Sequence, residues 1–328
     1  YLIYNAKEVS FDWLTPDGCT MIIPEVPFGE SVFVKSERIT FFHGEQVGYF
    51  NHAERLFYFF KKTSANHPKY CLVRIENEDE FAIEFIYNNQ GILQQIIDSS
   101  GREIMVENNA KGLISRIVLN EPNNPVQLIR YEYDDANDLV KIYDGFDKPT
   151  IIKYQNHLMT ERTDRNGDVF YWKYDSDLVT AKCIQTWGKD NLLRGRLVYE
   201  EGRTLAYDAY NNCTELIHEN GLVVKEINAL GFAKEYLYND AMELICETDE
   251  LGRQTMHAYD LSGNRIATTL PDGGTIAIQY NDLALPTMIK DAAEQTAIYQ
   301  YNEAGKLTAV IGIDNNVTQY KYKENGLV

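Results

Sequence analysis

Residues 259–280 decide the fold, and their sequence is Tyr259-Asp-Leu-Ser-Gly-Asn264, Arg265-Ile-Ala-Thr-Thr-Leu270, Pro271-Asp-Gly-Gly274 and Thr275-Ile-Ala-Ile-Gln-Tyr280. The first and third segments carry Asp, Asn, Gly and Pro, which favour tight turns, whereas the second and fourth are rich in β-branched residues. The stretch therefore predicts a β-hairpin. Because strands of about six residues are only ~20 Å long, such a hairpin must pack against neighbours to be stable.

The hairpin unit recurs at a fixed interval. Five Tyr residues from Tyr238 to Tyr322 lie 21 residues apart, and three earlier ones keep almost the same interval. These repeat markers are Tyr133, Tyr154, Tyr174, Tyr238, Tyr259, Tyr280, Tyr301 and Tyr322. A fixed period over many copies indicates an array of stacked units. We therefore expect an all-β fold of repetitive antiparallel hairpins, with a β-rich entry region at residues 1–84 and the repeats at residues 85–328.

Tyr residues alternate with other side chains at the strand ends, as in Tyr236-Leu-Tyr238 and Tyr299-Gln-Tyr301. This alternation places both rings of a pair on one face of a strand. Packing across strands would stabilise the sheet by about 0.2 to 1 kcal/mol per pair. We favour this packing role over a stacking platform for sugars or bases, because the rings keep the register of the repeat.

Two segments depart from the repeat. Residues 175–206 interrupt it and contain Cys183-Ile-Gln-Thr-Trp187-Gly188, which we expect to form a cap, a kink or a contact. In the entry region, Leu56–Phe60 is a continuous apolar run. A short helix capped by Asn51 is one alternative, but the aromatic residues of the run favour a buried strand.

Candidate catalytic groups are explained by turn structure. Acidic pairs such as Asp134–Asp135 and Asp164–Asp168 lie in predicted turns, where Asp caps its own backbone in an Asx turn. We extend this interpretation to Asn211, Asn228, Asn239, Asn281 and Asn302. The chain shows no motif for a metal, a cofactor or a catalytic nucleophile, so we predict none.

Composition excludes several other classes. The net charge of −18 disfavours nucleic acid as a direct ligand, because phosphate binding needs clustered Lys and Arg. The sequence contains no apolar run of about 18 residues, so it predicts no membrane-spanning helix. The five Cys residues are widely spaced without a CxxC pair, which predicts free thiols in place of disulfides or a zinc site.

The repeat units resemble the YD repeats of the rearrangement-hotspot (Rhs) family. The resemblance covers about residues 10–328 and rests on Tyr133-Asp-Asp-Ala-Asn-Asp-Leu-Val140, Thr163-Asp-Arg-Asn-Gly167, Tyr259-Asp-Leu-Ser-Gly-Asn264 and Leu270-Pro-Asp-Gly273. The Trp-Gly interruption is similar to one in bacterial Rhs effectors, which adds Trp187 and Gly188 to the repeat markers.

The resemblance implies an N-terminal part of the core of a bacterial polymorphic toxin. In that family the YD strands curl into a hollow β-shell, or cocoon, around a C-terminal toxin domain of the same polypeptide. The resemblance implies a structural role without enzymatic activity in this chain. The family's autoproteolytic segment is of Asp-Pro-x-Gly-Leu type, and the chain contains no Asp-Pro dipeptide.

The resemblance also implies a route of delivery. Many relatives are type VI secretion effectors, which implies a secretion spike protein and a chaperone as partners. The implied location is the bacterial cytoplasm before export, and then the outside or a target cell.

Two other classes remain as alternatives to the shell segment. An adhesion or carbohydrate-binding ectodomain of teneurin type would predict paired cysteines and a secretory signal. A carbohydrate-active enzyme would need an acidic cluster off the repeat register. We favour the shell segment because the period and the Trp-Gly interruption are both present.

Overall fold

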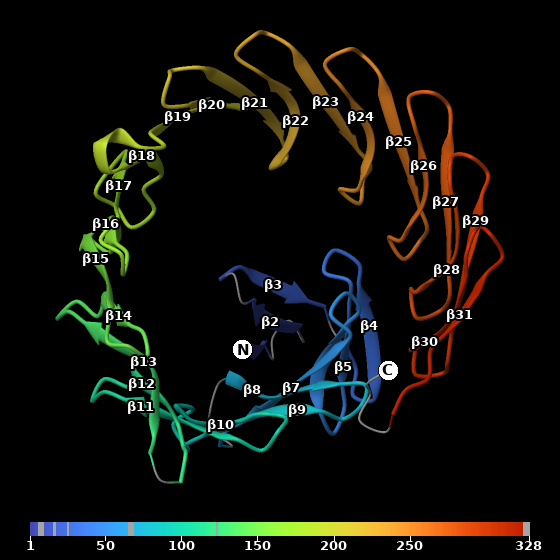
Figure 1. The fold of residues 1–328 in the computed structure, drawn as a ribbon. Coiled ribbons are helices and arrows are strands. Elements are labelled where there is room, and N and C mark those ends of the chain that lie inside the picture. The colour runs from blue at the N-terminus through green and yellow to red at the C-terminus, as the bar shows by residue number, and fades with distance from the viewer. Residues whose placement is uncertain (6–9, 16–17, 25, 65–68, 123, 324–328) are drawn as a thin grey trace. The chain divides into compact units, whose positions relative to one another are not determined.

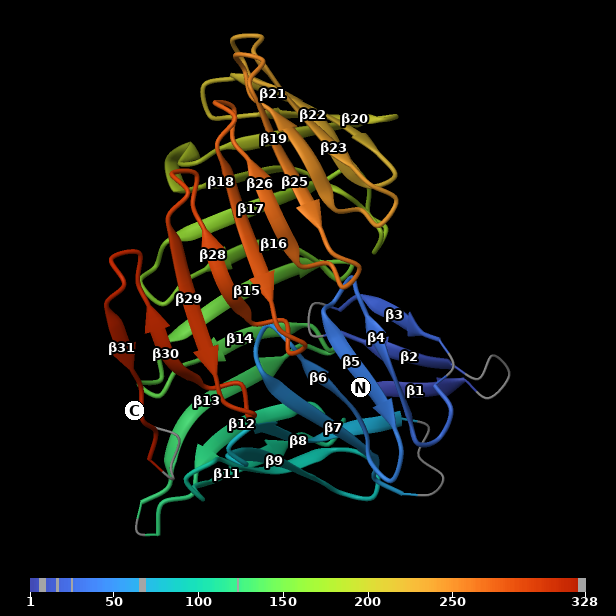
Figure 2. The same cartoon turned by 90° about the vertical axis from the view of Figure 1, so that its right-hand side faces the viewer.

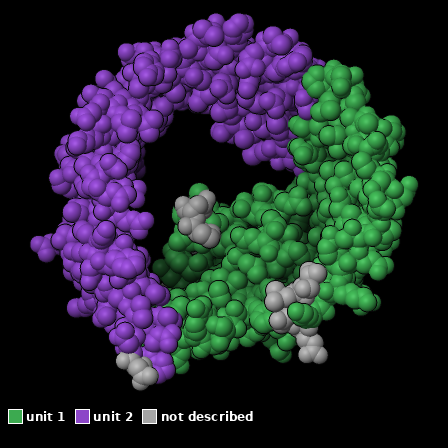
Figure 3. Space-filling model, in the orientation of Figure 1, with its two compact units in different colours: residues 1–106, 257–328 green, residues 107–256 purple. Residues whose placement is uncertain are grey.

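The structure, a computed structural model, describes residues 1–5, 10–15, 18–24, 26–64, 69–122 and 124–323 (Figure 1). The chain divides into two compact units, of which unit 1 contains residues 1–106 and 257–328 and unit 2 contains residues 107–256 (Figure 3). Within the described residues, strands form both units, and the helical structure is one short 3-10 segment, η1 (Lys189–Asn191). None of the described residues forms a helix long and apolar enough to cross a membrane.

The first eight strands of unit 1 enclose a hydrophobic core. They are β1 (Leu2–Asn5), β2 (Ser10–Leu14), β3 (Thr20–Ile23), β4 (Glu30–Val34), β5 (Ile39–His43), β6 (Val47–Asn51), β7 (Leu56–Lys62) and β8 (Lys69–Asn77). Strands β4 to β8 form an antiparallel meander, while β1 pairs with both β8 and β2, and β2 pairs with β3. The side chains of Leu2, Phe11, Ile23, Ile39 and Phe41 are at most 1% exposed in this core.

Strand β7 confirms the strand predicted for Leu56–Phe60. Asn51 does not begin a helix. Its side-chain Oδ1 accepts the backbone N–H groups of Ala53 and Glu54 at 2.9 and 3.1 Å, and this closes the turn between β6 and β7. The aromatic run therefore crosses the meander as one of its strands.

Strand β8 links this core to the repeats. It pairs with β7 along one edge, and its other edge is shared by β1, opposite Tyr70, and by β9 (Ala82–Tyr87), opposite Arg74. Strands β10 (Leu93–Ile97) and β11 (Glu103–Asn108) continue the antiparallel pairing from β9. The first repeat strand is thus hydrogen-bonded to a strand of the core.

The C-terminal part of unit 1 is a second antiparallel meander (Figure 2). Its strands are β26 (Arg265–Thr269), β27 (Thr275–Tyr280), β28 (Pro286–Lys290), β29 (Thr296–Tyr301), β30 (Leu307–Ile311) and β31 (Val317–Gln319). Each pairs with the next along the chain, as the hairpin prediction requires.

Unit 2 is a single meander in which every strand pairs antiparallel with its sequence neighbours. Its strands are β12 (Ile114–Leu119), β13 (Val126–Tyr133), β14 (Leu139–Tyr143), β15 (Pro149–Gln155), β16 (Leu158–Thr163), β17 (Val169–Tyr174), β18 (Cys183–Gly188), β19 (Gly195–Glu200), β20 (Arg203–Tyr207), β21 (Cys213–Glu219), β22 (Leu222–Ile227), β23 (Ala233–Tyr238), β24 (Leu244–Thr248) and β25 (Gln254–Tyr259), whose last residues belong to unit 1. The all-β fold of antiparallel hairpins is confirmed. The division at residues 84 and 85 stays a prediction.

Many of the repeat turns are closed by the side chain of their first residue. Asp164 Oδ1 accepts the backbone N–H groups of Asn166 and Asp168 at 2.8 and 3.0 Å, and Gly167 takes a left-handed φ of 91°. The hydrogen bonds from the backbone of Asp168 and then Asn166 hold the pKa of Asp164 below its usual value. The same pair of bonds forms at Asn88, Asp98, Asn109, Asp144, Asp208, Asn228, Asn239, Asp249, Asp260, Asn281 and Asp291.

The Asx interpretation is confirmed for Asp164, Asn228, Asn239, Asn281 and Asn302. It is wrong for Asn211. In that turn Asp208 is the acceptor, and Asn211 instead takes the left-handed position at φ 62°. Asn tolerates this conformation better than most residues. Asp134 also acts as a turn acceptor, since its Oδ1 receives the N–H of Asp138 at 2.9 Å.

Candidate functional site

The repeat-marker tyrosines join adjacent strands through their hydroxyl groups. Tyr301, the last residue of β29, donates its O–H to the carbonyl of Pro286, the first residue of β28, at 2.9 Å. Tyr174, Tyr238, Tyr280 and Tyr322 each donate in the same way to a carbonyl 15 residues earlier, at 2.8, 3.2, 3.2 and 2.8 Å. The hydroxyl thus satisfies a carbonyl at the beginning of the neighbouring strand.

The other tyrosine markers occupy related places. Tyr133 donates to the carbonyl of Ile114 at 2.8 Å, and burial raises the pKa of its hydroxyl. Tyr154 lies near the end of β15 with a half-buried ring, and Tyr259 ends β25. In strand β23, Tyr236 and Tyr238 are half-buried while Leu237 between them is exposed, so both rings lie on one face.

The Trp-Gly interruption does not break the sheet. Strand β18 contains Trp187 and Gly188 and pairs with both β17 and β19. The Trp187 ring stacks on Tyr171 with centroids 5.5 Å apart. Gly188 is buried and donates its N–H to the carbonyl of Leu192 at 2.7 Å. An added Cβ at this position would be tightly packed, 3.2 Å from the Phe170 ring. The departure from the period is therefore a tight loop after β18.

The polar contacts whose partners are farthest apart in sequence lie within unit 1. There the entry region meets the turns of the last repeats. We call this set the seam, defined by Arg38, Arg55, Asp79, Asn264 and Lys306. The seam contacts join residues that are more than 220 positions apart. Sequence reasoning did not identify any of these residues as contacts.

The first seam contact is a relay of three side chains. Arg38 Nη2 donates to Asn264 Oδ1 at 2.6 Å, and Asn264 Nδ2 donates to Asp260 Oδ2 at 2.8 Å. Asn264 is a buried polar residue with 4% exposure, so both of its amide atoms need partners. The pKa of Asp260 lies below its usual value, because hydrogen bonds from Asn264 and Ser262 and the charge of Arg38 outweigh the larger opposing effect of desolvation.

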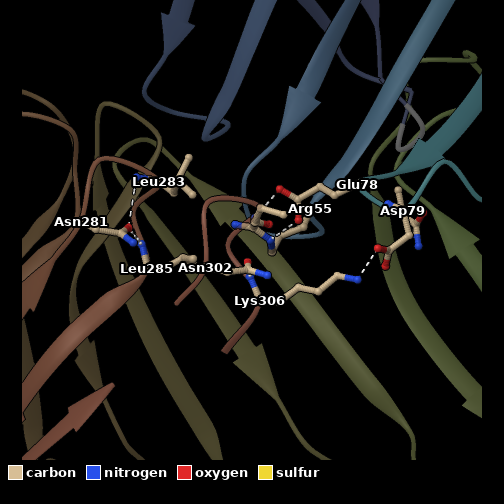
Figure 4. A network of polar contacts seen from close by, with 10 residues as sticks. Arg55, Glu78, Asp79, Asn281, Leu283, Leu285, Asn302 and Lys306 are labelled. Carbon is tan, nitrogen blue, oxygen red and sulfur yellow. Dashed lines mark hydrogen bonds and ion pairs between the residues drawn. The ribbon is translucent and has the colours of Figure 1, made fainter. Parts of the chain in front are cut away.

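The second contact is made by Arg55 (Figure 4). Its guanidinium forms a bidentate ion pair with Glu78, in which Nε lies 2.8 Å from Oε2, and Nη2 also donates to the carbonyl of Ala304 at 3.3 Å. Gly305 follows Ala304 in the turn and takes a left-handed φ of 74°. A Cβ at this position would overlap Arg55 Nη2 and lie 3.2 Å from Leu285 Cδ1. Glycine is favoured here both by the left-handed backbone and by the close approach of Arg55.

The third contact is an ion pair between Lys306 Nζ and Asp79 Oδ1 (Figure 4). The ammonium also lies 5.3 Å from the centroid of the Tyr322 ring. The side chains of this pair and of Arg55–Glu78 are 20 to 24% exposed. We therefore expect the free-energy contribution of each pair to fall between two limits. Exposed pairs contribute at most ~1 kcal/mol, and disruption of a buried pair costs ~3–5 kcal/mol.

The two seam arginines carry backbone strain. Arg38 and Arg55 take left-handed φ values of 52° and 56°, which cost a residue with a Cβ about 1–2 kcal/mol. Glycine would relieve that strain but could not reach the repeat turns. The strained positions thus place two long cationic side chains against those turns.

No group of three or more His, Cys, Asp or Glu side chains in the described part of the chain could hold a metal ion. Cys71, Cys183, Cys213 and Cys246 are free thiols. Of the carboxylates considered from the sequence, Asp134 and Asp164 act as turn acceptors.

Comparison with curated proteins finds similarity to an Rhs protein. The chain is 23% identical over 299 residues to the probable deoxyribonuclease RhsB of Dickeya dadantii (strain 3937), across 76% of this chain and 20% of that protein. The chain thus spans about a fifth of the length of this relative. No family model matches the chain.

Solved structures share the fold. The crystal structure of TcdB2-TccC3-Cdc42 matches 98% of this chain and 18% of its own chain with a TM-score of 0.55 at 13% identity. The crystal structure of TcdB2-TccC3 without its hypervariable C-terminal region matches 97% of this chain and 17% of its own with a TM-score of 0.54 at 11% identity. At such identities the likeness concerns the fold alone. The Rhs relative is thus similar in sequence to this chain, the solved structures share its fold, and both agree with the resemblance of its repeat units to those of the Rhs family.

Proposed function

We propose that this chain is a segment of the wall of a hollow β-shell, which encloses a C-terminal toxin domain of the same polypeptide until delivery. The observation that carries this proposal is the thinness of the repeat sheet. Among the described residues of unit 2, the buried hydrophobic side chains are Val118 and Ile152, although the unit contains an unbroken meander. A sheet with so little core of its own is suited to serve as a barrier.

The hydrogen bonding of the sheet supports the same role. The strands pair with their sequence neighbours, the Asx turns close the hairpins, and the Tyr hydroxyls bind strand-start carbonyls. These local bonds stabilise a wall that has few buried side chains. The wall can therefore keep both faces accessible and still remain folded.

The charge of the chain favours one class of cargo. A net charge of −18 attracts cations and repels anions, so a basic toxin domain such as a nuclease is the cargo that this segment suits best. We extend the proposal to the delivery route: assembly in the bacterial cytoplasm, and then export with a secretion spike protein and a chaperone. The adhesion alternative would predict paired cysteines, whereas Cys71, Cys183, Cys213 and Cys246 are free thiols.

Limited proteolysis of the full polypeptide that contains this chain tests the proposal. The rate of cleavage of the toxin domain is compared with that of the same domain expressed alone. We expect the shell to slow cleavage at least tenfold, because a protease cannot reach an enclosed substrate. Equal cleavage rates in the two proteins would refute enclosure.

A further inference from the structure

A pocket of about 540 Å³ lies in the entry region of unit 1. It forms where the hairpin of β2 and β3 packs on the meander of β4 to β8, and Trp13 contacts Tyr49 there. Met21, which pairs with Trp13, lines the pocket from β3, and Thr20 lies beside it. Tyr58, which pairs with Tyr49, lines it from β7. The volume lies in the range of ligand sites, and the proposed shell function does not use this pocket.

The wall of the pocket is aromatic. The rings of Tyr49 and Tyr58 stack with centroids 4.6 Å apart and an angle of 17° between their planes. The Trp13 ring is tilted by 51° against Tyr49, with centroids 4.8 Å apart. The faces of such rings carry the negative end of a quadrupole and attract cations, most strongly for Trp and Tyr.

The rim of the pocket carries two carboxylates without a counter-ion. Glu37 lies in the turn between β4 and β5, and Glu54 lies in the turn between β6 and β7. Both are exposed, and neither forms an ion pair with a described residue. Glu54 accepts the O–H of Tyr58 at 2.5 Å, which leaves its charge in place. The next residues in the sequence, Arg38 and Arg55, bind the repeat turns instead.

The Tyr49 hydroxyl is a polar group that lacks a protein partner. Tyr49 is only 4% exposed and lines the pocket, and its hydroxyl forms no hydrogen bond with a described residue. Burial, and then the proximity of Tyr58 and Glu54, raises the pKa of this hydroxyl, so it is protonated and neutral at pH 7. Polar groups this deeply buried are normally hydrogen-bonded, and the phenol oxygen can accept a hydrogen bond. A donor that enters the pocket would therefore complete its bonding.

We propose that this pocket binds the guanidinium group of an arginine side chain carried by a basic polypeptide. A guanidinium is a planar cation with five donors and no acceptor, and it stacks on aromatic faces. It can donate to the two carboxylates and to the Tyr49 hydroxyl while it lies against the rings. The lysine ammonium is compact and more strongly hydrated, so it matches the aromatic wall less well. The net charge of −18 favours the approach of a basic partner, and the assignment stands apart from the shell function.

Titration calorimetry of the protein with N-acetyl-arginine amide, which mimics an arginine of a polypeptide, tests the proposal. The comparisons are N-acetyl-citrulline amide, a neutral compound of nearly the same shape, and N-acetyl-lysine amide. A salt concentration of about 0.15 M screens unspecific attraction to the acidic surface. We expect saturable binding of the arginine compound in the millimolar range, at least tenfold tighter than the citrulline compound and at least threefold tighter than the lysine compound.

Three variants locate the site. Glu37→Gln should weaken binding of the arginine compound at least threefold, because it removes a rim charge from an exposed turn. Glu45→Gln is the matched control, since Glu45 is exposed in the next turn of the same meander and does not line the pocket. Tyr49→Phe should also weaken binding at least threefold and leave the melting temperature unchanged, because the hydroxyl has no protein partner to lose.

Four results would overturn the proposal. They are the absence of saturable binding of the arginine compound, equal binding of the citrulline or the lysine compound, equal weakening by Glu37→Gln and Glu45→Gln, and an unchanged affinity of Tyr49→Phe. A lower melting temperature of Tyr49→Phe with full affinity would show instead that the hydroxyl is structural.

Discussion

Substitution of Gly305 by Ala tests the seam directly. The substitution has two separate costs. A left-handed φ of 74° costs alanine about 1–2 kcal/mol, and the new Cβ forces Arg55 away from the turn. Arg55 then loses its bond to the Ala304 carbonyl or its pairing with Glu78, and hydrogen bonds of charged groups are worth about 1.5–3 kcal/mol. We expect a total loss of ~3–4 kcal/mol in the stability of unit 1.

Gly273 provides the matched control. It lies in another repeat turn of unit 1 with a φ of 88°, and an added Cβ would meet nothing within 4 Å. Gly273→Ala should therefore lose only the backbone cost of ~1–2 kcal/mol. The difference between the two variants isolates the contact with Arg55.

Urea unfolding, monitored by hydrogen exchange in the turns at residues 52–55 and 302–306, measures this difference in stability. Hydrogen exchange is needed because a chain of two units need not unfold in one step. In an Arg55→Ala background, Gly305→Ala should cost no more than Gly273→Ala, since the steric conflict is gone. Equal losses for the two glycines in the wild-type background would refute the seam contact.

Three further outcomes follow from the repeat geometry. Met242→Gly should raise stability by about 1 kcal/mol in urea unfolding, because Met242 occupies a left-handed position at φ 61°, and Met242→Ala should not. Tyr301→Phe should cost about 0.5–1.5 kcal/mol of stability by removing the hydrogen bond to the Pro286 carbonyl. The Tyr299 hydroxyl donates no hydrogen bond to a described residue, so Tyr299→Phe should be neutral. The reverse order would contradict the role of the marker hydroxyl. The pKa of Asp249 is lowered by hydrogen bonds from the Arg253 side chain and then from backbone N–H groups. The ionised carboxylate therefore stabilises the fold at neutral pH, and this stabilisation is lost as the pH falls through the folded-state pKa. Asp249→Asn should flatten the acid side of the curve of stability against pH, and an unchanged curve would contradict this.

The sequence predicted the repeats well because their signals are local. Tyr and the following Asp or Asn mark the end of a strand and the start of a turn, and both functions are carried out within about 15 residues. The strand at Leu56–Phe60 was also predictable, because an aromatic run fits a buried strand. The error at Asn211 arose because Asp and Asn are common at two positions of the same turn. One is the side-chain acceptor, here Asp208, and the other is the left-handed residue, here Asn211.

The seam could not be predicted in the same way. Its contacts join residues such as Arg38 and Asn264, and no periodicity relates the two positions. Lys306 occupies the same last position of a turn as Arg102 and Arg253, which bind the acid of their own turn. A charged residue at that position therefore gives no sign of whether its partner is local or distant.

The distribution of buried side chains explains why a non-repetitive region precedes the repeats. A thin meander is stabilised mainly by contacts between neighbouring strands, so its first strand would lose half of them without a partner. Here β9 pairs with β8, and β8 belongs to the compact core that contains Leu2, Phe11 and Phe41. The same core reaches the turns of the last repeats through Arg55 and Asp79. The core thus caps one edge of the array by backbone pairing and binds the turns of later repeats through side-chain contacts. A further copy of the repeat could not serve both purposes, because its own core is too small.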